Sequence, residues 1–199
     1  MPADPLTEFR RSLENLDATR RRMEILYAGN TIGLRDIHSV YEALFLRGVT
    51  GFETFLERQF FGILKGKIKY PKSRVSLRMA PSSHQAASDI VLQNDDYLKW
   101  IPFKYTESRA KLYLNGGRPF SELTDGDRSI VKTITIIRNA IAHTGPHAIT
   151  NFKEKVIGAS VLLPVEKRPA GFLRSQVTPA QRRFEVYMNR LAKIAVDIS

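Results

Sequence analysis

The chain has 199 residues, 43% of them hydrophobic and 26% charged, a composition typical of one soluble globular domain over residues 1–199. Its 31 Lys and Arg against 20 Asp and Glu give a formal net charge of +11. Such an excess favours a polyanionic partner, namely nucleic acid, an anionic membrane surface or an acidic protein. The absence of cysteine excludes disulfides, thiolate metal sites and a cysteine nucleophile. The N-terminus is polar and no apolar run is long enough to span a membrane, so we expect a cytoplasmic protein without membrane contact.

The first predicted element is a helix over residues 5–28. Its apolar residues recur three, four or seven positions apart, which is the pattern of one helix face. They are Leu6, Phe9, Leu13, Leu16, Met23 and Tyr27. Arg20 lies on this face, so either its stem packs on the core while its guanidinium reaches solvent, or it points into a functional groove.

A second, longer helix is predicted over residues 34–65, on the order of 45 Å at about 1.5 Å per residue. Its apolar residues step by one, three or four positions through the whole segment. They are Ile37, Val40, Tyr41, Leu44, Phe45, Val49, Phe52, Phe55, Leu56, Phe60, Ile63 and Leu64. Gly48 and Gly51 weaken such a helix, so they indicate that another backbone approaches closely there.

Residues 65–83 form a basic segment without an acidic side chain, which we interpret as an inserted loop or irregular hairpin. Together with the arginines at 20–22, this segment contains candidate contacts to an RNA backbone. The candidates are Lys65, Lys67, Lys69, Lys72, Arg74, Arg78, Arg20, Arg21 and Arg22. A solvated charged face is the alternative for both groups. Tyr70 could also stack on a base.

The middle of the chain is predicted to contain three helices. The first is a short one near residues 86–92, and the second covers residues 106–114 and ends before a Gly-Gly pair. The third begins at Thr124 or Asp125, either of which can cap it, and ends near His143, after which glycine and proline stop it.

The C-terminal part begins with an irregular segment at residues 145–177, in which residues 156–165 are predicted to be a short strand or a buried loop. The last helix is predicted to open at Thr178-Pro179, because proline favours the first helical position. It would bury Phe184, Tyr187, Met188, Leu191, Ile194, Ala195 and Ile198. Long helices with only minor strand or irregular insertions predict an all-α bundle.

The strongest candidate site is Arg138-Asn139-Ala140-Ile141-Ala142-His143, at the end of a helix whose core face is predicted from its isoleucines. These are Ile130, Ile134, Ile137 and Ile141. Arg138 and His143 then lie on two flanks of the opposite face. The strip between them consists of Thr135, Asn139 and Ala142. Small residues allow a second helix to pack closely, and we expect that helix to come from a second copy related by a twofold axis.

These residues resemble the HEPN family, whose signature is an arginine, usually followed by a polar residue, and a histidine a few positions later. Arg138-Asn139 and His143 fit its commonest spacing. Gly116-Gly117-Arg118-Pro119-Phe120 is similar to the segment that precedes this motif in a bacterial branch of these RNases, and Glu53, in Gly51-Phe52-Glu53, is similar to that branch's acidic position. The resemblance covers roughly residues 35–145.

The resemblance implies a helical bundle that dimerises through its motif helices and often acts as a metal-independent endoribonuclease. Many members of the family are toxins or phage-defence effectors, and some lack activity and only bind. A toxic ribonuclease must be kept silent, so an antitoxin or regulatory protein is a possible partner besides RNA. Residues 65–83 and 145–177 depart from a minimal four-helix bundle and receive no family role.

These side chains fit RNA cleavage because RNA contains its own nucleophile, the 2′-hydroxyl. His143 can serve as base or acid near neutral pH, and the C-terminus of a helix favours a cation, which suits an acid. Arg138 presents a planar, permanently charged fork to phosphate, and Asn139 would orient the phosphate or the imidazole. Glu53 could hold Arg138 in position. The hypothesis predicts cleavage of RNA but not DNA to a 2′,3′-cyclic phosphate, without metal or cofactor.

Purely structural interpretations of the motif remain as alternatives. Arg138 could be a solvated arginine, and His143 a helix-end residue that bonds the last carbonyls. The chain could then be a non-catalytic module that binds nucleic acid or nucleotide, or an interaction protein for an acidic partner. His38, His84 and His147 lack ligand spacing and are interpreted as surface residues, and a His143–His147 metal pair is disfavoured by the helix break between them.

Overall fold

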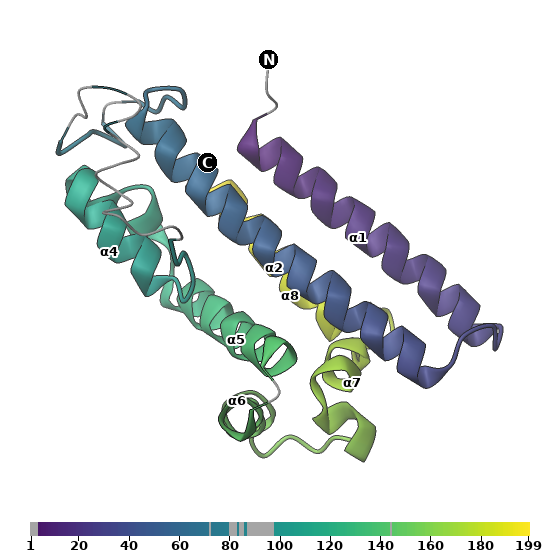
Figure 1. Cartoon of the computed structure of the whole chain (residues 1–199). Coiled ribbons are helices and arrows are strands. Elements are labelled where there is room, and N and C mark those ends of the chain that lie inside the picture. Colours follow the sequence, from purple (N-terminus) through teal and green to yellow (C-terminus); the bar gives the residue numbers. More distant parts are fainter. Residues whose placement is uncertain (1–3, 72, 80–82, 84–85, 87–97, 144) are drawn as a thin grey trace.

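The computed structural model describes residues 4–71, 73–79, 83, 86, 98–143 and 145–199 (Figure 1). The protein is mostly helical (72%), with seven α-helices and one two-stranded hairpin within these residues. The all-α prediction is therefore confirmed. Within the same residues, no helix is both long and apolar enough to cross a membrane.

Helices α1 (Pro5–Ala28) and α2 (Leu34–Leu64) have nearly the predicted bounds. The first begins where the Asp4 carboxylate accepts a hydrogen bond from the backbone N–H of Thr7 at 3.1 Å. At the start of α2, the Asp36 carboxylate accepts one from the N–H of Gly33 at 2.9 Å. Figure 1 shows α1 and α2 running side by side in opposite directions.

The remaining helices pack around α2, which contacts α1, α4, α5, α7 and α8. In Figure 1, α5 lies on the side of α2 away from α1, and α8 lies behind α2. These helices are α4 (Lys104–Tyr113), α5 (Asp125–Ala142), α6 (Pro146–Phe152), α7 (Pro169–Arg174) and α8 (Arg183–Ile198). Short helical turns complete the described chain at Asn115–Gly117, Phe120–Glu122, Lys153–Ile157 and Pro164–Lys167.

The two glycines of α2 differ in what they face. A Cβ on Gly48 would clash with the Sδ atom of Met188 on α8, so a side chain there would require Met188 to move. A Cβ on Gly51 would make only ordinary contact with the Phe9 ring, at 3.5 Å. The expectation that another backbone approaches both glycines is wrong, because the neighbours are side chains.

The last helix begins later than predicted, at Arg183. Thr178 instead ends strand β1 (Gln176–Thr178), and Pro179 lies in the turn before strand β2 (Gln181–Arg182), which pairs antiparallel to β1. The helix starts where the Glu185 carboxylate accepts a hydrogen bond from the N–H of Arg182 at 2.7 Å. Its predicted buried residues are confirmed except for Tyr187, which is half-buried.

Three further stretches had predictions of their own: residues 156–165 as a strand or buried loop, residues 65–83 as a loop or irregular hairpin, and residues 86–92 as a helix. Residues 156–165 form neither a strand nor a buried loop, because they leave the π-helical turn Lys153–Ile157 and run over the surface, with Val161 fully exposed (101%). The described residues of 65–83 form turns and one isolated bridge, between Leu77 and Leu114, so the irregular interpretation is confirmed for them. The helix predicted near 86–92 lies outside the described residues.

Arginines connect separate elements of the fold through ion pairs with carboxylates. The pairs are Arg20–Glu185, Arg58–Glu8, Arg74–Glu122, Arg128–Glu107, Arg174–Glu24, Arg182–Glu24 and Arg190–Asp127. They join the N-terminal helix to the C-terminal third of the chain and α5 to α4 and α8. A guanidinium can bind a carboxylate through two donors at once, which fixes the relative orientation of the two elements.

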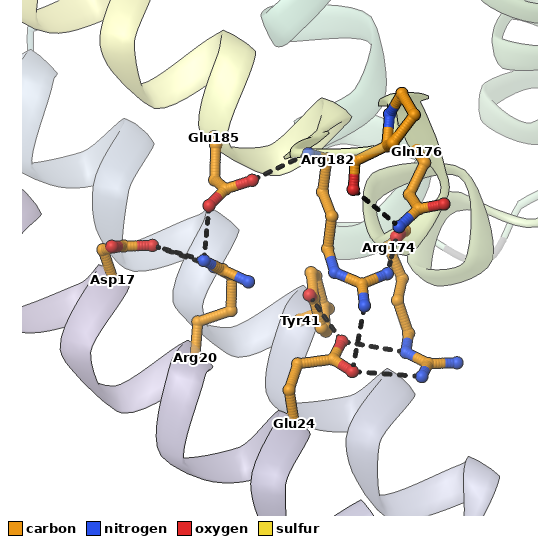
Figure 2. A network of polar contacts seen from close by, with 9 residues as sticks. Asp17, Arg20, Glu24, Tyr41, Arg174, Gln176, Arg182 and Glu185 are labelled. Atoms are coloured by element: carbon orange, nitrogen blue, oxygen red, sulfur yellow. Dashed lines mark hydrogen bonds and ion pairs between the residues drawn. The ribbon is translucent and has the colours of Figure 1, made fainter. Parts of the chain in front are cut away.

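Figure 2 shows the densest group of these contacts, around Glu24. The Glu24 carboxylate accepts hydrogen bonds from Arg174 at 3.0 and 3.1 Å and from the hydroxyl of Tyr41 at 2.7 Å, and Arg182 lies 3.2 Å away. Burial raises the pKa of Glu24, but the hydrogen bonds from Arg174 and Tyr41 together lower it by more than burial raises it. The net pKa therefore lies below the usual value. The charged carboxylate is thus the form that joins α1 to α2, α7 and β2.

Arg20 belongs to the same region and is buried, with 5% of its surface exposed. Its guanidinium lies 2.8 Å from Asp17 and 2.5 Å from Glu185 (Figure 2). The two expectations for this residue, a solvent-exposed head or a functional groove, are therefore both wrong. An arginine on an apolar face is here satisfied by an acidic partner on another helix.

Replacing Arg20 with methionine should lower the free energy of unfolding by about 3 kcal/mol, because it leaves Glu185 beside the core without its cation. Arg21→Ala is the matched control, since Arg21 pairs with the same Asp17 but its side chain is 70% exposed. Its loss should stay within about 0.5 kcal/mol. Urea unfolding followed by circular dichroism measures both, and equal losses would contradict the structural role of Arg20.

Candidate functional site

The motif lies at the C-terminal end of α5, which is capped at both ends. The Thr124 hydroxyl oxygen accepts a hydrogen bond from the N–H of Asp127 at 3.1 Å, so Thr124 is the N-cap. The helix ends at Ala142, and the N–H of His143, the C-cap residue, donates to the carbonyl of Asn139 at 2.9 Å. The predicted end of this helix is confirmed to within one residue.

The buried face of α5 differs slightly from the prediction. Ile134 and Ile137 are buried as expected, whereas Ile130 and Ile141 are half-buried. Thr135, expected on the outward strip, is buried, and its hydroxyl donates to the carbonyl of Val131 at 2.8 Å. The helix is therefore rotated toward its Thr135 side, because α5 packs against α2, α7 and α8 together.

A cavity of about 300 Å³ brings the four predicted catalytic residues together. Arg138, Asn139 and His143 come from α5 and its C-cap, and Glu53 comes from the middle of α2. Glu53 is buried, Arg138 and Asn139 are half-buried, and His143 is exposed. The Arg138 guanidinium donates to the side-chain oxygen of Asn139 at 3.2 Å. Residues 85 positions apart in sequence, Glu53 and Arg138, thus border one polar hollow.

The third wall of this cavity was not predicted from the sequence. It consists of Lys99, Ile101 and Pro102 in the segment before α4, together with Tyr105 on α4. Lys99 is exposed and adds a second cation beside Arg138. The only signal in the sequence is the apolar run Trp100 to Phe103, which follows the lysine directly but has no helical or strand periodicity.

Trp100 holds this wall in place. Its ring is 1% exposed and packs against Phe60, and its indole N–H donates to the Glu57 carboxylate on α2 at 3.0 Å. The hydroxyl of Thr106 donates to the Trp100 carbonyl at 2.5 Å, and the Arg109 guanidinium lies 4.6 Å from the centre of the indole ring. Lys99 therefore lies next to a residue whose ring and whose backbone carbonyl are both held by contacts with the rest of the protein.

A second cavity, of about 380 Å³, shares Asn139 and His143 with the first. Its other lining residues are Ile136, Gly145, His147, Ala148 and Asn151. The helix break at Gly145-Pro146 is present, because α6 begins anew at Pro146. His143 and His147 nevertheless face one space, and His147 is exposed, as expected from the sequence.

The candidate RNA contacts in the basic segment lie away from these cavities. Residues 65–79 follow α2 at the end of the bundle opposite α6 (Figure 1). Lys67 and Lys69 are exposed, whereas Lys65 lies 5.1 Å from the centre of the Phe61 ring. Lys72 lies outside the described residues. The described residues of this basic segment do not line the motif cavity.

The arginines and the tyrosine of this segment are largely engaged within the protein. Arg74 donates to the carbonyl of Asp197 at 2.8 Å and to that of Ser199 at 3.2 Å, and its guanidinium lies 5.3 Å from the Tyr70 ring centre. The Tyr70 hydroxyl donates to the carbonyl of Ile198 at 2.5 Å. Arg78 is exposed and donates to the Lys111 carbonyl at 3.4 Å. Tyr70 therefore stacks on an arginine of its own chain.

The three arginines at positions 20–22 also differ in exposure and in their partners within the protein. Arg20 is buried and paired, and a guanidinium in that state is a poor phosphate ligand, so Arg20 leaves the set of candidate RNA contacts. Arg21 is exposed and pairs with Asp17 at 2.7 Å. Arg22 is exposed and donates to the Ala18 carbonyl of its own helix at 3.3 Å.

No family model matches the chain, and no curated protein or solved structure matches it either. The resemblance to the HEPN family thus rests only on the sequence features described above, namely the motif, the segment at residues 116–120 and Glu53. What the fold adds is spatial: residues picked out by their order in the sequence lie around one cavity.

Replacing Trp100 should show that one indole positions the third wall. Trp100→Ala removes a large buried ring and should cost about 3–5 kcal/mol of unfolding free energy. Trp100→Phe keeps a ring but leaves Glu57 without its donor, so a smaller loss of about 1–2 kcal/mol is expected. Urea unfolding followed by circular dichroism gives both values. Equal losses for the two variants would contradict the positioning role of the ring.

Proposed function

We propose that this protein is a metal-independent endoribonuclease of the HEPN type, which cuts RNA by attack of the 2′-hydroxyl on the adjacent phosphate. The observation that supports the proposal is the shared cavity of Glu53, Arg138, Asn139 and His143. Spacing alone would not distinguish a solvated arginine from a functional one. A buried carboxylate beside two cations and an exposed imidazole is an arrangement that stability does not require.

In this proposal Arg138 binds the non-bridging oxygens of the scissile phosphate and stabilises the charge that develops on them. Lys99, which lines the same cavity, adds a second cation for the same anion. Asn139 holds one edge of the Arg138 guanidinium, because its side-chain oxygen accepts a hydrogen bond from Nη1 at 3.2 Å. Glu53 is a positioning residue, because a buried carboxylate in this cavity favours a cation that stays in place.

His143 moves protons in this reaction. Its imidazole is exposed at the rim of the cavity, where it can reach a substrate in solution. As an imidazolium it gives a proton to the departing 5′-oxygen, and a second group takes the proton of the 2′-hydroxyl. The products are a 2′,3′-cyclic phosphate and a 5′-hydroxyl. DNA, which lacks the 2′-hydroxyl, would not react.

We further propose that the enzyme works as a homodimer through the outward face of α5. Ala142 is exposed beside His143, and its small side chain permits a close approach of a second helix. Exposed basic residues away from the cavity, such as Lys67, Lys69 and Arg21, then bind the RNA backbone. A role as a toxin or phage-defence effector, restrained by an antitoxin or regulatory protein, completes the proposal.

Purified protein incubated with structured RNA in EDTA should release fragments that end in a 2′,3′-cyclic phosphate. Arg138→Ala and His143→Ala should each lower the cleavage rate by about 10²–10⁴-fold, since each removes a group that acts in the transition state. Arg138→Lys should recover little, because an ammonium lacks the planar fork. Arg47→Ala, an exposed arginine of α2 outside the cavity, is the control and should cut at the wild-type rate.

Cleavage that is equal in the wild type and in the Arg138→Ala, His143→Ala double variant would point to a contaminating nuclease. RNA binding without cleavage by any of these proteins would favour the alternative, a non-catalytic module. Binding of an acidic protein in place of RNA would mean that Arg138 and His143 take no part in phosphate chemistry.

The dimer is tested by sedimentation velocity at micromolar concentration. The wild type should sediment as a dimer, and Ala142→Arg as a monomer, because two bulky cations would face each other across the twofold axis. Ser129→Arg puts the same cation on an exposed position of the same helix, away from the proposed contact, and should leave the dimer intact. A monomeric wild type would remove the dimer from the mechanism.

A further inference from the structure

The cavity next to the motif contains a second imidazole. His147 lies on α6 and lines the 380 Å³ cavity whose other wall is formed by Asn139 and His143. Apart from His143, the other residues of this lining have no titratable side chain. The two histidines of one chain thus face a single space, at the point where it adjoins the cavity of Arg138 and Glu53.

Asn151 fixes the His147 ring from the next turn of α6. Its side-chain amide lies 3.0 Å from Nε2 of His147. The atom nearest to Nε2 is the amide nitrogen of Asn151, so its N–H donates and Nε2 accepts. The ring hydrogen of the neutral imidazole then lies on Nδ1, and the basic nitrogen is Nε2. The contact places this basic nitrogen next to Asn151, which lines the same cavity.

Cleavage through the 2′-hydroxyl needs two proton transfers, one from the nucleophile and one to the leaving group. One imidazole can carry out only one of these transfers at a time, because the base must be neutral and the acid must be protonated. Besides His143, the polar groups that line the cavity of Arg138 are a guanidinium, an amide, a lysine, a buried carboxylate, the Tyr105 phenol and the Thr135 hydroxyl, and none of these is an imidazole. A second imidazole next to the first would complete the set within one chain.

We propose that His147 is the general base of the RNA cleavage, acting opposite His143 as the general acid. Nε2 of His147 exchanges its hydrogen bond from the Asn151 amide for one from the 2′-hydroxyl, and it takes the proton of that hydroxyl as the oxygen forms its bond to phosphorus. The bond from phosphorus to the 5′-oxygen breaks, and that oxygen takes a proton from the His143 imidazolium. His147 ends protonated and His143 neutral, and exchange with water restores both. This inference rests on the proposed ribonuclease function.

The test compares His147→Phe, which keeps an aromatic ring, and His147→Gln, which keeps hydrogen bonding, with the wild type. Both should lower kcat for RNA cleavage by about 10²-fold or more, with KM unchanged, because only proton transfer is lost. The limb of the pH–rate profile on which activity rises with pH should disappear in both. His38→Gln, a histidine that lines neither cavity, is the control and should behave as wild type.

A substrate with sulfur in place of the 5′-oxygen assigns the two histidines their roles. A thiolate leaves without being protonated, so this substrate needs no general acid. It should restore His143→Ala to within a few fold of the wild type, and it should leave His147→Phe as slow as before. Asn151→Ala, which frees the ring, should fall between wild type and His147→Phe in kcat.

Several outcomes would overturn the assignment. Full activity and an unchanged pH profile in His147→Phe would place the second proton carrier elsewhere, for example on His143 of a second copy. A raised KM with wild-type kcat would make His147 a binding residue. Rescue of His147→Phe by the sulfur substrate would make it the acid. If the wild type cuts no RNA at all, the ribonuclease proposal itself fails, whereas an active wild type with an indifferent His147 refutes this inference alone.

Discussion

The structure depends on the burial of α2 along its whole length. Of its 31 residues 15 are buried, and it contacts the helices on every side of it. Each large apolar side chain removed from water contributes on the order of 1.5–3 kcal/mol, far more than the helix gains from its own backbone. Because α5 packs against this fixed axis, apolar packing determines that Glu53 of α2 and Arg138 of α5 line the same cavity. The polar cavity is positioned by residues that take no part in its chemistry.

A carboxylate placed within that packing has an energetic cost that the fold alone does not explain. Glu53 is 9% exposed, and apart from Gln59 and two glycines the other buried residues of α2 are aromatic or aliphatic. A buried charge must be compensated by partners, and an apolar residue of similar size would fill the same position more stably. Polar residues at such positions often serve function, since they break a local rule without helping the fold.

Helices could be predicted from the sequence where the apolar pattern is long and periodic. The prediction failed where a single contact determines the local structure. The bounds of α1 and α2 follow from apolar spacing and from the residues at their ends. Thr178-Pro179 fits a helix start and a hairpin turn equally well, and the capping carboxylate of Glu185 settles the choice. The partner of Arg20 lies 165 residues away, and the wall that includes Lys99 is fixed by one indole. Non-local contacts of this kind leave no trace in local periodicity.

Arginine and lysine side chains occupy different places in this structure, and the difference has a practical consequence. Within the described residues, the ion pairs that join separate elements use arginine, while Lys67, Lys69 and Lys99 are exposed. Chemistry specific for primary amines, such as acetylation, would therefore remove positive charge from the surface without loosening these junctions between helices. The folded frame and the surface charge of this protein can thus be altered separately.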